Sequence, residues 1–201
     1  AGKPIRACSS KNDESFKKWA GGPSPEPVLP AAKGLNRFVW DMRYATIPGV
    51  PDVYIEASYR GHKASPGKYR FSLNVAGKAL ETDGEIVANP LYQTSGAAHE
   101  AYHAVMSGME REAAAMHRLV NGLYDKRKQL EALLAALPSG EKLAGARTDV
   151  QAILDKFKAW DGDMVQRRTR AYDDVENFPN KFPANYLFVI NQTESDLPPV
   201  I

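Results

Sequence analysis

The sequence contains one cysteine, Cys8, so it cannot form an internal disulfide bond and must fold around an apolar core instead. It also lacks any apolar run near the roughly 20 residues that a membrane-spanning helix needs, so we expect no membrane partner. An excess of charge of one sign is missing too. The 26 basic and 24 acidic side chains leave a net charge of +2, which excludes a strong electrostatic attraction to nucleic acid. With 43% apolar residues, the chain has the composition of an ordinary globular protein.

Residues 1–94 predict a small antiparallel β-sandwich of the immunoglobulin or fibronectin type. Most of the prolines and glycines lie in this half, between short runs in which apolar and polar residues alternate. Residues 35–44 alternate in this way, and one face of that strand would carry Phe38, Trp40 and Met42. We therefore expect these three side chains in the core of the sandwich.

A second strand pair is predicted over residues 66–87, with a tight connection at Ala76-Gly77-Lys78. The chain opens on the same Ala-Gly-Lys sequence, followed by a candidate strand at residues 5–9. Because a hairpin turn needs a strand before it, we expect the first strand of the sandwich to lie upstream of Ala1. The alternative is a disordered terminus followed by an edge strand. Residues 20–33 are rich in proline and predict an exposed loop.

Residues 95–201 predict helices, because apolar residues recur there in steps of three and four. The first such series predicts one long helix over about residues 96–137, ended by Pro138-Ser139-Gly140. A second series over residues 143–164 predicts a helix that returns antiparallel, because the connection is short. Residues 183–192 predict a short final helix. The expected fold class is therefore α+β, a small sandwich followed by a long antiparallel helical hairpin.

Residues 99–103, HEAYH, form the one motif with an obvious chemistry. On a helix, His99 and His103 would share a face as zinc ligands, and Glu100 would act as the base of a zinc peptidase. A third ligand would have to come from another element. Folding the hairpin about residue 140 would bring three acidic residues near the histidines: Asp173, Asp174 and Glu176.

Other features of the sequence argue against a metal. Three further candidate ligands lie farther along the same helix and are expected to point away from the histidines: Glu110, Glu112 and His117. No strand is predicted beside the motif to align a peptide substrate. His99 also continues the apolar series before Tyr102, which fits a packed interfacial histidine. The preferred interpretation therefore has no catalytic, cofactor-binding or metal-binding residues, and a zinc site at His99, His103 and Glu176 is the alternative.

Several stretches together resemble the C-terminal region of bacterial proteins with sialidase-type (BNR, Asp-box) repeats, which are often described as sortilin-like or as glycosyl hydrolases. These stretches are GLNRFVWDMRY, PGKYRFSLNVAGK and YDDVENFPNKFPANYLFVINQTESDLPP. The resemblance implies an accessory module behind a large β-propeller, in a protein that is periplasmic or secreted. Asp-box repeats are absent from this sequence, so the resemblance assigns no propeller chemistry to its residues.

The expected function is therefore that of a non-catalytic C-terminal interaction module. Its expected partner is the upstream β-propeller of the same protein, with another protein partner as a further option. A zinc-dependent hydrolase that uses the HEAYH motif is the alternative function.

Overall fold

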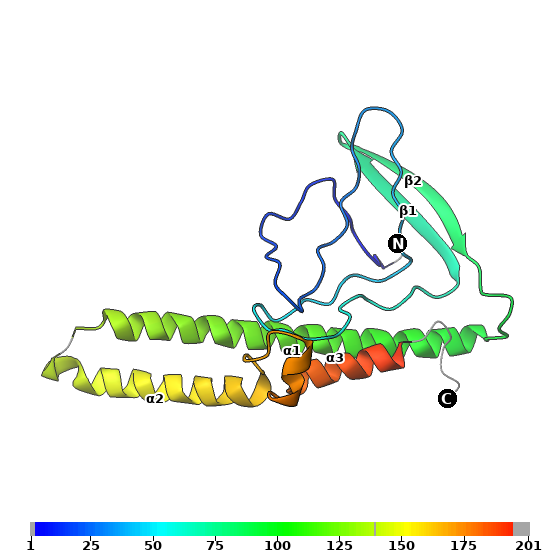
Figure 1. Ribbon diagram of the computed structural model, residues 1–201. Helices are drawn as coiled ribbons and strands as arrows, with labels where there is room; N and C mark the ends of the chain where they lie inside the picture. The colour runs from blue at the N-terminus through cyan, green and yellow to red at the C-terminus, as the bar shows by residue number, and fades with distance from the viewer. Residues whose placement is uncertain (1–2, 139, 195–201) are drawn as a thin grey trace.

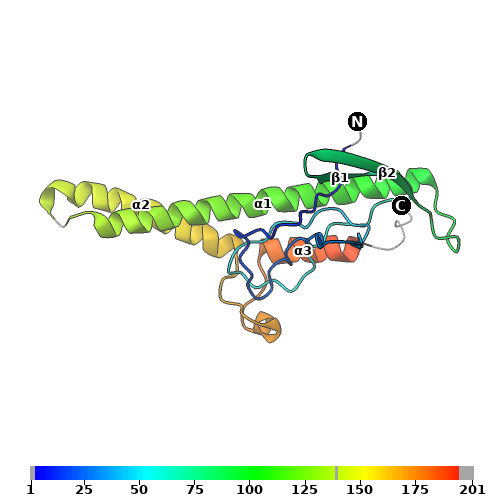
Figure 2. The ribbon, with the colours of Figure 1, turned by 90° about the horizontal axis from the view of Figure 1, so that it is seen from above.

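A long helical hairpin forms the base of the computed structural model, which describes residues 3–138 and 140–194, and the irregular first half of the chain and its β-hairpin stand on one side of it (Figure 1). Helix α1 spans Gly96–Ala136, and helix α2 spans Glu141–Met164. The two helices lie side by side and run antiparallel in both Figure 1 and Figure 2. The predicted long helix is therefore confirmed, and α2 covers the predicted return helix.

The ends and the buried face of α1 follow from its sequence. Ser95 caps its start, and the Ser95 hydroxyl accepts a hydrogen bond from the backbone N–H of Ala98. Pro138 follows its end. The buried side chains recur on one face of the helix, and they are Tyr102, Met106, Ala113, His117 and Val120. Among the residues that the structure describes, no helix has the length and apolarity needed to cross a membrane.

After α2 the chain leaves the hairpin before it returns to α1. It forms the 3-10 helix η1 at Tyr172–Glu176 and then helix α3 at Phe182–Thr193, which lies along α1 (Figure 2). Leu187 and Ile190 face α1 and are 0% and 1% exposed. The short helix predicted at residues 183–192 is confirmed.

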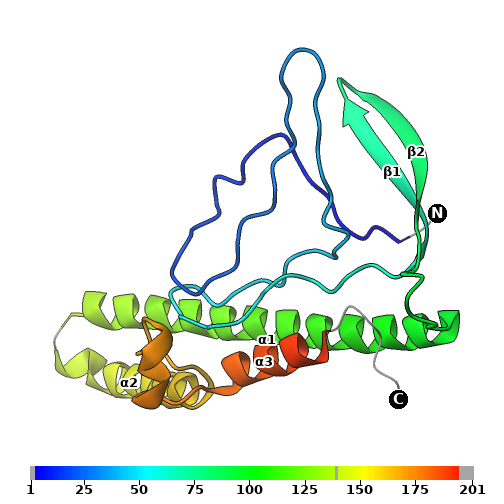
Figure 3. The same cartoon turned by 45° about the vertical axis from the view of Figure 1, so that its right-hand side comes forward.

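The sheet consists of two antiparallel strands, β1 at Gly67–Val75 and β2 at Lys78–Ile86. Their connection is the two-residue turn Ala76-Gly77, and both residues have positive φ values, 49° and 77°. This is the backbone conformation of a type I′ turn, whose twist suits a β-hairpin. The predicted hairpin and its tight connection are therefore confirmed. Figure 3 shows the hairpin standing away from the helices.

The predicted β-sandwich is wrong. Outside β1 and β2, the described residues contain only an isolated bridge between Arg43 and Lys63, and the segment before β1 is otherwise irregular. Residues 35–44 form no strand, because their backbone hydrogen bonds are confined to the end of the segment, where Ala64 donates to Met42 and Tyr44 donates to His62. Met42 also has a φ of 58°, a left-handed conformation that interrupts an extended chain.

The predicted core face of that segment is wrong as well. Phe38 is 36% exposed and Met42 is 46% exposed. Trp40 is half-buried, and its ring packs edge-on against Tyr69 and Phe71 of β1 rather than inside a sandwich. These aromatic contacts fix the loop to the hairpin, but they do not make a second sheet.

The other expectations for the first residues have mixed outcomes. Residues 5–9 form no strand, although the carbonyl of Ser9 accepts a hydrogen bond from the backbone of Leu29. Residues 20–33 form the irregular loop that their prolines predict. The expected opening turn lies mostly outside the described residues, and a strand upstream of Ala1 lies outside them entirely.

The core is built where the irregular segment meets the helices. Five loop side chains are at most 4% exposed and join the buried faces of α1 and α3, namely Ile47, Val50, Val53, Ile55 and Tyr59. Burial of these side chains holds the segment on α1 without a sheet. The same packing brings the loop around residue 62 onto the first turns of α1, where polar side chains gather.

Candidate functional site

The candidate site lies on the N-terminal third of α1. His103, Ser107 and Glu110 are spaced by four and three residues, so they share one face of the helix. All three side chains are partly buried. This face is covered by the loop that contains Tyr44 and His62.

His62 is inserted between two of these helix residues. Its Nε2 atom lies 2.8 Å from His103 Nδ1, and its Nδ1 atom lies 2.9 Å from Glu110 Oε2. The backbone N–H of His62 also donates to Glu110 Oε1, at 2.6 Å. His62 is only 1% exposed, so these bonds satisfy a polar ring that water does not reach.

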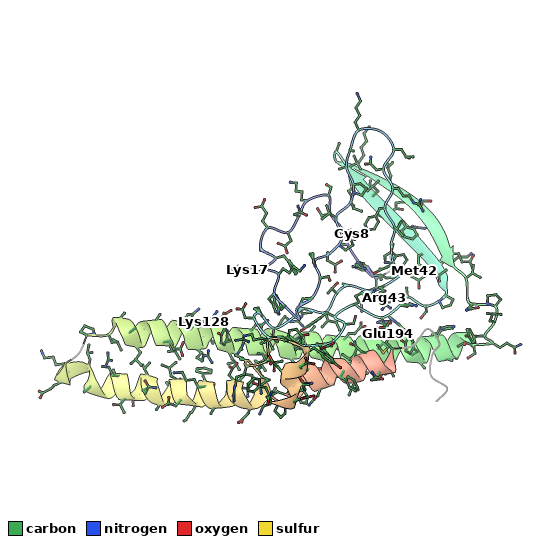
Figure 4. All side chains as sticks on the ribbon, viewed as in Figure 1. Cys8, Lys17, Met42, Arg43, Lys128 and Glu194 are labelled. Carbon is green, nitrogen blue, oxygen red and sulfur yellow. The ribbon has the colours of Figure 1, made fainter. Side chains whose placement is uncertain are left out.

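Tyr44 closes the cluster from the loop side. Its ring stacks on His62 at 4.3 Å between centroids and on His103 at 5.1 Å. Burial raises the pKa of the Tyr44 hydroxyl, with smaller contributions from Tyr69 and Glu110, so it remains a protonated hydrogen-bond donor at neutral pH. The neighbouring Arg43 and Glu194 form an ion pair that joins this loop to the end of α3 (Figure 4).

The hydrogen bonds of the cluster determine where its protons lie. A carboxylate only accepts, so the bond to Glu110 places the hydrogen of His62 on Nδ1. With both rings neutral, His62 Nε2 then accepts, and the hydrogen of the 2.8 Å bond belongs to His103 Nδ1. The Nε2 atom of His103 is left with a lone pair that can accept a proton or a hydrogen bond.

This arrangement is an oriented acceptor and not a serine-type catalytic triad. Ser107 Oγ lies 3.3 Å from His103 Nδ1, the same atom that bonds to His62. A catalytic serine would instead need the opposite ring nitrogen as its base, with the acidic partner on Nδ1. The cluster therefore offers one basic nitrogen, His103 Nε2, held in place by His62 and Glu110.

The structure does not bring the sequence-predicted zinc ligands together. His103 contacts the loop, while His99 is partly buried and Glu100 is exposed on the first turns of α1. The three acidic candidates lie in η1, at the far end of α3 from Thr193 (Figure 1). In the described part of the chain, no group of three histidine, cysteine, aspartate or glutamate side chains is arranged to hold a metal ion.

The acidic candidates lie elsewhere because α2 ends at Met164. Residues 165–181 then leave the hairpin, so counting residues across the turn no longer gives the neighbour of His103. One of the η1 carboxylates bonds to its own loop instead. Asp174 Oδ2 accepts hydrogen bonds from the backbone N–H groups of Arg170 and Ala171.

A second histidine of α1 is buried farther along the helix. His117 is 0% exposed, and its Nδ1 lies 2.6 Å from the carbonyl oxygen of Pro48, so Nδ1 is the donor. Its Nε2 atom has no hydrogen-bond partner in the described part of the chain. Burial lowers the pKa of His117, although the bond to Pro48 acts in the opposite direction. His117 therefore belongs to the core and pins the loop to α1.

Comparison with protein-family models, curated proteins and solved structures gives no significant match.

We expect acid to destabilise the fold, because His103 and His117 both have lowered pKa values. Burial lowers the pKa of His103, and the positive charges of His62 and Lys3 lower it further, while Glu110 raises it. Burial also lowers the pKa of His117, whose ring lies beside Pro48 and Tyr59. Because the pKa is lower in the folded state, the unfolded chain binds more protons at acidic pH, and protons therefore favour unfolding. The stability that these neutral rings contribute is complete above the ordinary histidine pKa of 6.5. It is lost as the pH falls from there through the folded pKa values.

Thermal melts between pH 7.5 and pH 5.5 test this expectation. The wild-type melting temperature should fall by several degrees over this range, and the slope should be shallower in His117→Gln, because a glutamine can still donate to Pro48 but does not titrate. A wild-type melting temperature that stays constant, or an unchanged slope in the variant, would contradict the assignment of His117 as a buried neutral ring.

Proposed function

We propose that this chain is a non-catalytic docking module, in which the helical hairpin is the scaffold and the β1–β2 hairpin presents the binding face. The register supports this proposal because it separates the two faces of the hairpin. Tyr69, Phe71 and Leu73 of β1 lie on one face, where Leu73 pairs with Leu80 of β2. The opposite face is polar.

The polar face is suited to solvent. Arg70 Nε donates to Asp83 Oδ1 at 3.0 Å, and Ser72 Oγ donates to Glu81 Oε1 at 3.1 Å. All of these residues are exposed. Exposed pairs of this kind add little stability, but they keep this face soluble.

The apolar face is only half covered, and this observation carries the proposal. Trp40 packs on the base of the hairpin, 5.8 Å from the rings of both Tyr69 and Phe71. Towards the turn the apolar side chains are uncovered, and Leu73, Val75 and Leu80 are 49%, 53% and 60% exposed. An isolated two-stranded hairpin is marginally stable in water, so a partner that covers this face would also stabilise the hairpin.

The strand edges support the same conclusion. In the described part of the chain, the backbones of β1 and β2 bond only to each other, so both outer edges are available. Free edges together with an apolar face are typical of a surface that pairs with another β-structure.

The partner that we propose is the β-propeller that the resemblance places upstream in the same protein. It supplies β-structure for the hairpin to pack on. A partner in the same chain is held at a high effective concentration, so a small apolar face is sufficient for docking.

A binding experiment with two matched double variants tests the proposal. The upstream region is produced separately, and its affinity for this chain is measured by calorimetry. We expect Leu73→Lys/Leu80→Lys to weaken binding at least about tenfold, because charges replace apolar contacts. The control, Asn74→Lys/Ala79→Lys, adds the same number of charges on the polar face and should change the affinity less than about twofold.

Three outcomes would contradict the proposal. They are a lack of association with the wild-type chain even at about millimolar concentration, which matches the effective concentration of tethered partners, equal losses in the two double variants, and a gene whose reading frame begins at Ala1. Circular dichroism of each variant shows whether the helices are intact, so that a loss of binding is not mistaken for unfolding.

A further inference from the structure

A cleft of about 320 Å³ lies beside the histidine cluster, away from the docking face. It is bounded by the first described residues, by the loop after Tyr44 and by α1. Proline, isoleucine and alanine side chains form part of its wall. Its polar lining consists of Lys3, Tyr44, Thr46, His103, Ser107, Glu110 and Arg111.

Two cations line this cleft and are available to a ligand. Lys3 forms no ion pair within the described part of the chain. Among the residues that the structure describes, Arg111 pairs with Glu112 alone, at 3.2 Å, and these side chains are 71% and 62% exposed. An exposed pair of this kind is weak, so the Arg111 guanidinium can turn to an anion in the cleft at little cost.

The cleft also contains a hydrogen-bond acceptor in a fixed orientation. When both rings are neutral, the bonds to Glu110 and His62 place the hydrogen of His103 on Nδ1, which leaves the lone pair of Nε2 without a partner in the described part of the chain. Burial lowers the pKa of His103, so the ring stays neutral at pH 7 and above. A ligand hydroxyl can donate to this atom, and the Tyr44 hydroxyl lines the same cleft as a donor.

Glu110 limits the charge that the cleft accepts. Its two oxygens are already bonded to the N–H groups of His62, and its side chain is only 12% exposed. The negative charge of Glu110 offsets one of the two positive charges of Lys3 and Arg111. The cleft therefore favours a ligand with a single negative charge over one with two.

We propose that this cleft binds a small carboxylic acid that also bears hydroxyl groups. Lys3 and Arg111 bind the carboxylate, and a ligand hydroxyl donates to Nε2 of His103. This site is separate from the docking face of the hairpin, so it does not depend on the proposed function.

A titration with gluconate tests the proposal, with the ring resonances of His103 followed by NMR at pH 7.5. Sorbitol lacks the carboxylate and hexanoate lacks the hydroxyls, so both should shift these resonances less than gluconate at equal concentration. In Arg111→Gln the dissociation constant for gluconate should rise about tenfold, because a charge-assisted hydrogen bond is lost. Arg118→Gln removes an exposed cation of α1 that does not line the cleft. This control should change the dissociation constant for gluconate less than about twofold.

A third variant separates the two halves of the site. This variant lacks the His103 resonances, so its binding is measured by calorimetry. His103→Gln should remove the preference for gluconate over hexanoate, while the affinity for hexanoate persists. The proposal is overturned if gluconate shifts the His103 resonances no more than sodium chloride does. Equal effects of sorbitol and gluconate, or of Arg111→Gln and Arg118→Gln, would overturn it too.

Discussion

Replacement of Asp161 by asparagine is expected to lower the free energy of unfolding by about 2 to 3 kcal/mol. Asp161 lies near the end of α2 and is 6% exposed. Its carboxylate accepts two hydrogen bonds from Arg167, both at 2.7 Å, and a third from Arg127 of α1 at 3.2 Å. It therefore joins the end of α2 and the chain that follows to α1.

The expected cost is large because the two cations stay close to each other when the charge of Asp161 is removed. The guanidinium groups of Arg127 and Arg167 lie over the same ring, that of Tyr124, at 4.4 Å and 3.8 Å from its centroid. Of the described carboxylates that form ion pairs with these two arginines, Glu131, 3.8 Å from Arg127, would then remain. Loss of one partner from a buried ion pair typically costs about 3 to 5 kcal/mol. The arginines here are partly exposed, so we expect a smaller loss.

Chemical denaturation and thermal melts measure this loss. For a chain of this size, the expected loss corresponds to a fall of roughly 5 to 10 °C in melting temperature. Asp163→Asn is the matched control, because Asp163 is exposed on the same helix and should change stability by less than about 0.5 kcal/mol. Equal effects of the two substitutions would show that Asp161 does not hold the arginines as the structure describes.

The helices could be predicted from the sequence because their signal is local. Apolar residues at steps of three and four repeat over the whole of α1, and Ser95 and Pro138 mark its ends. The hairpin of β1 and β2 was predictable for the same reason, because the turn Ala76-Gly77 lies between two alternating runs. In each case the residues that decide the structure are neighbours in the sequence.

The rest of the first half could not be predicted in this way. Residues 35–44 alternate as a strand does, but a strand also needs a partner, and that partner would be distant in sequence. The structure instead buries Ile47, Val50 and Val53 against α1, which gives this segment a core without a sheet. Alternation therefore indicated a strand where none forms.

The sequence predicts only part of the candidate site. His103 stood out through the zinc-peptidase spacing, although the structure gives it different partners. The sequence interpretation excludes Glu110 because it lies farther along the same helix, yet an offset of seven residues returns to the same face. His62 carried no signal of its own, because its contacts with His103 and Glu110 span 41 and 48 residues of sequence.

Replacement of Leu187 by alanine is expected to lower the free energy of unfolding by about 3 kcal/mol, because it leaves a cavity where α3 packs on α1. Leu187 is 0% exposed, and Ile190 beside it is 1% exposed. A helix of 12 residues is too short to be stable alone, so α3 depends on this packing. The Asn191 side chain adds hydrogen bonds to both backbone groups of Ser58, at 2.7 Å and 2.9 Å, which fix the orientation of the helix.

Phe188→Ala is the control for Leu187→Ala, since it removes a larger side chain from the next position of the same helix. Phe188 is 57% exposed, so its loss should cost less than about 1 kcal/mol. Urea denaturation followed by circular dichroism measures both variants. Successive residues of a helix point about 100° apart, so the order of the two effects reports which face of α3 is buried. A greater loss in Phe188→Ala than in Leu187→Ala would mean that α3 packs on α1 through a different face.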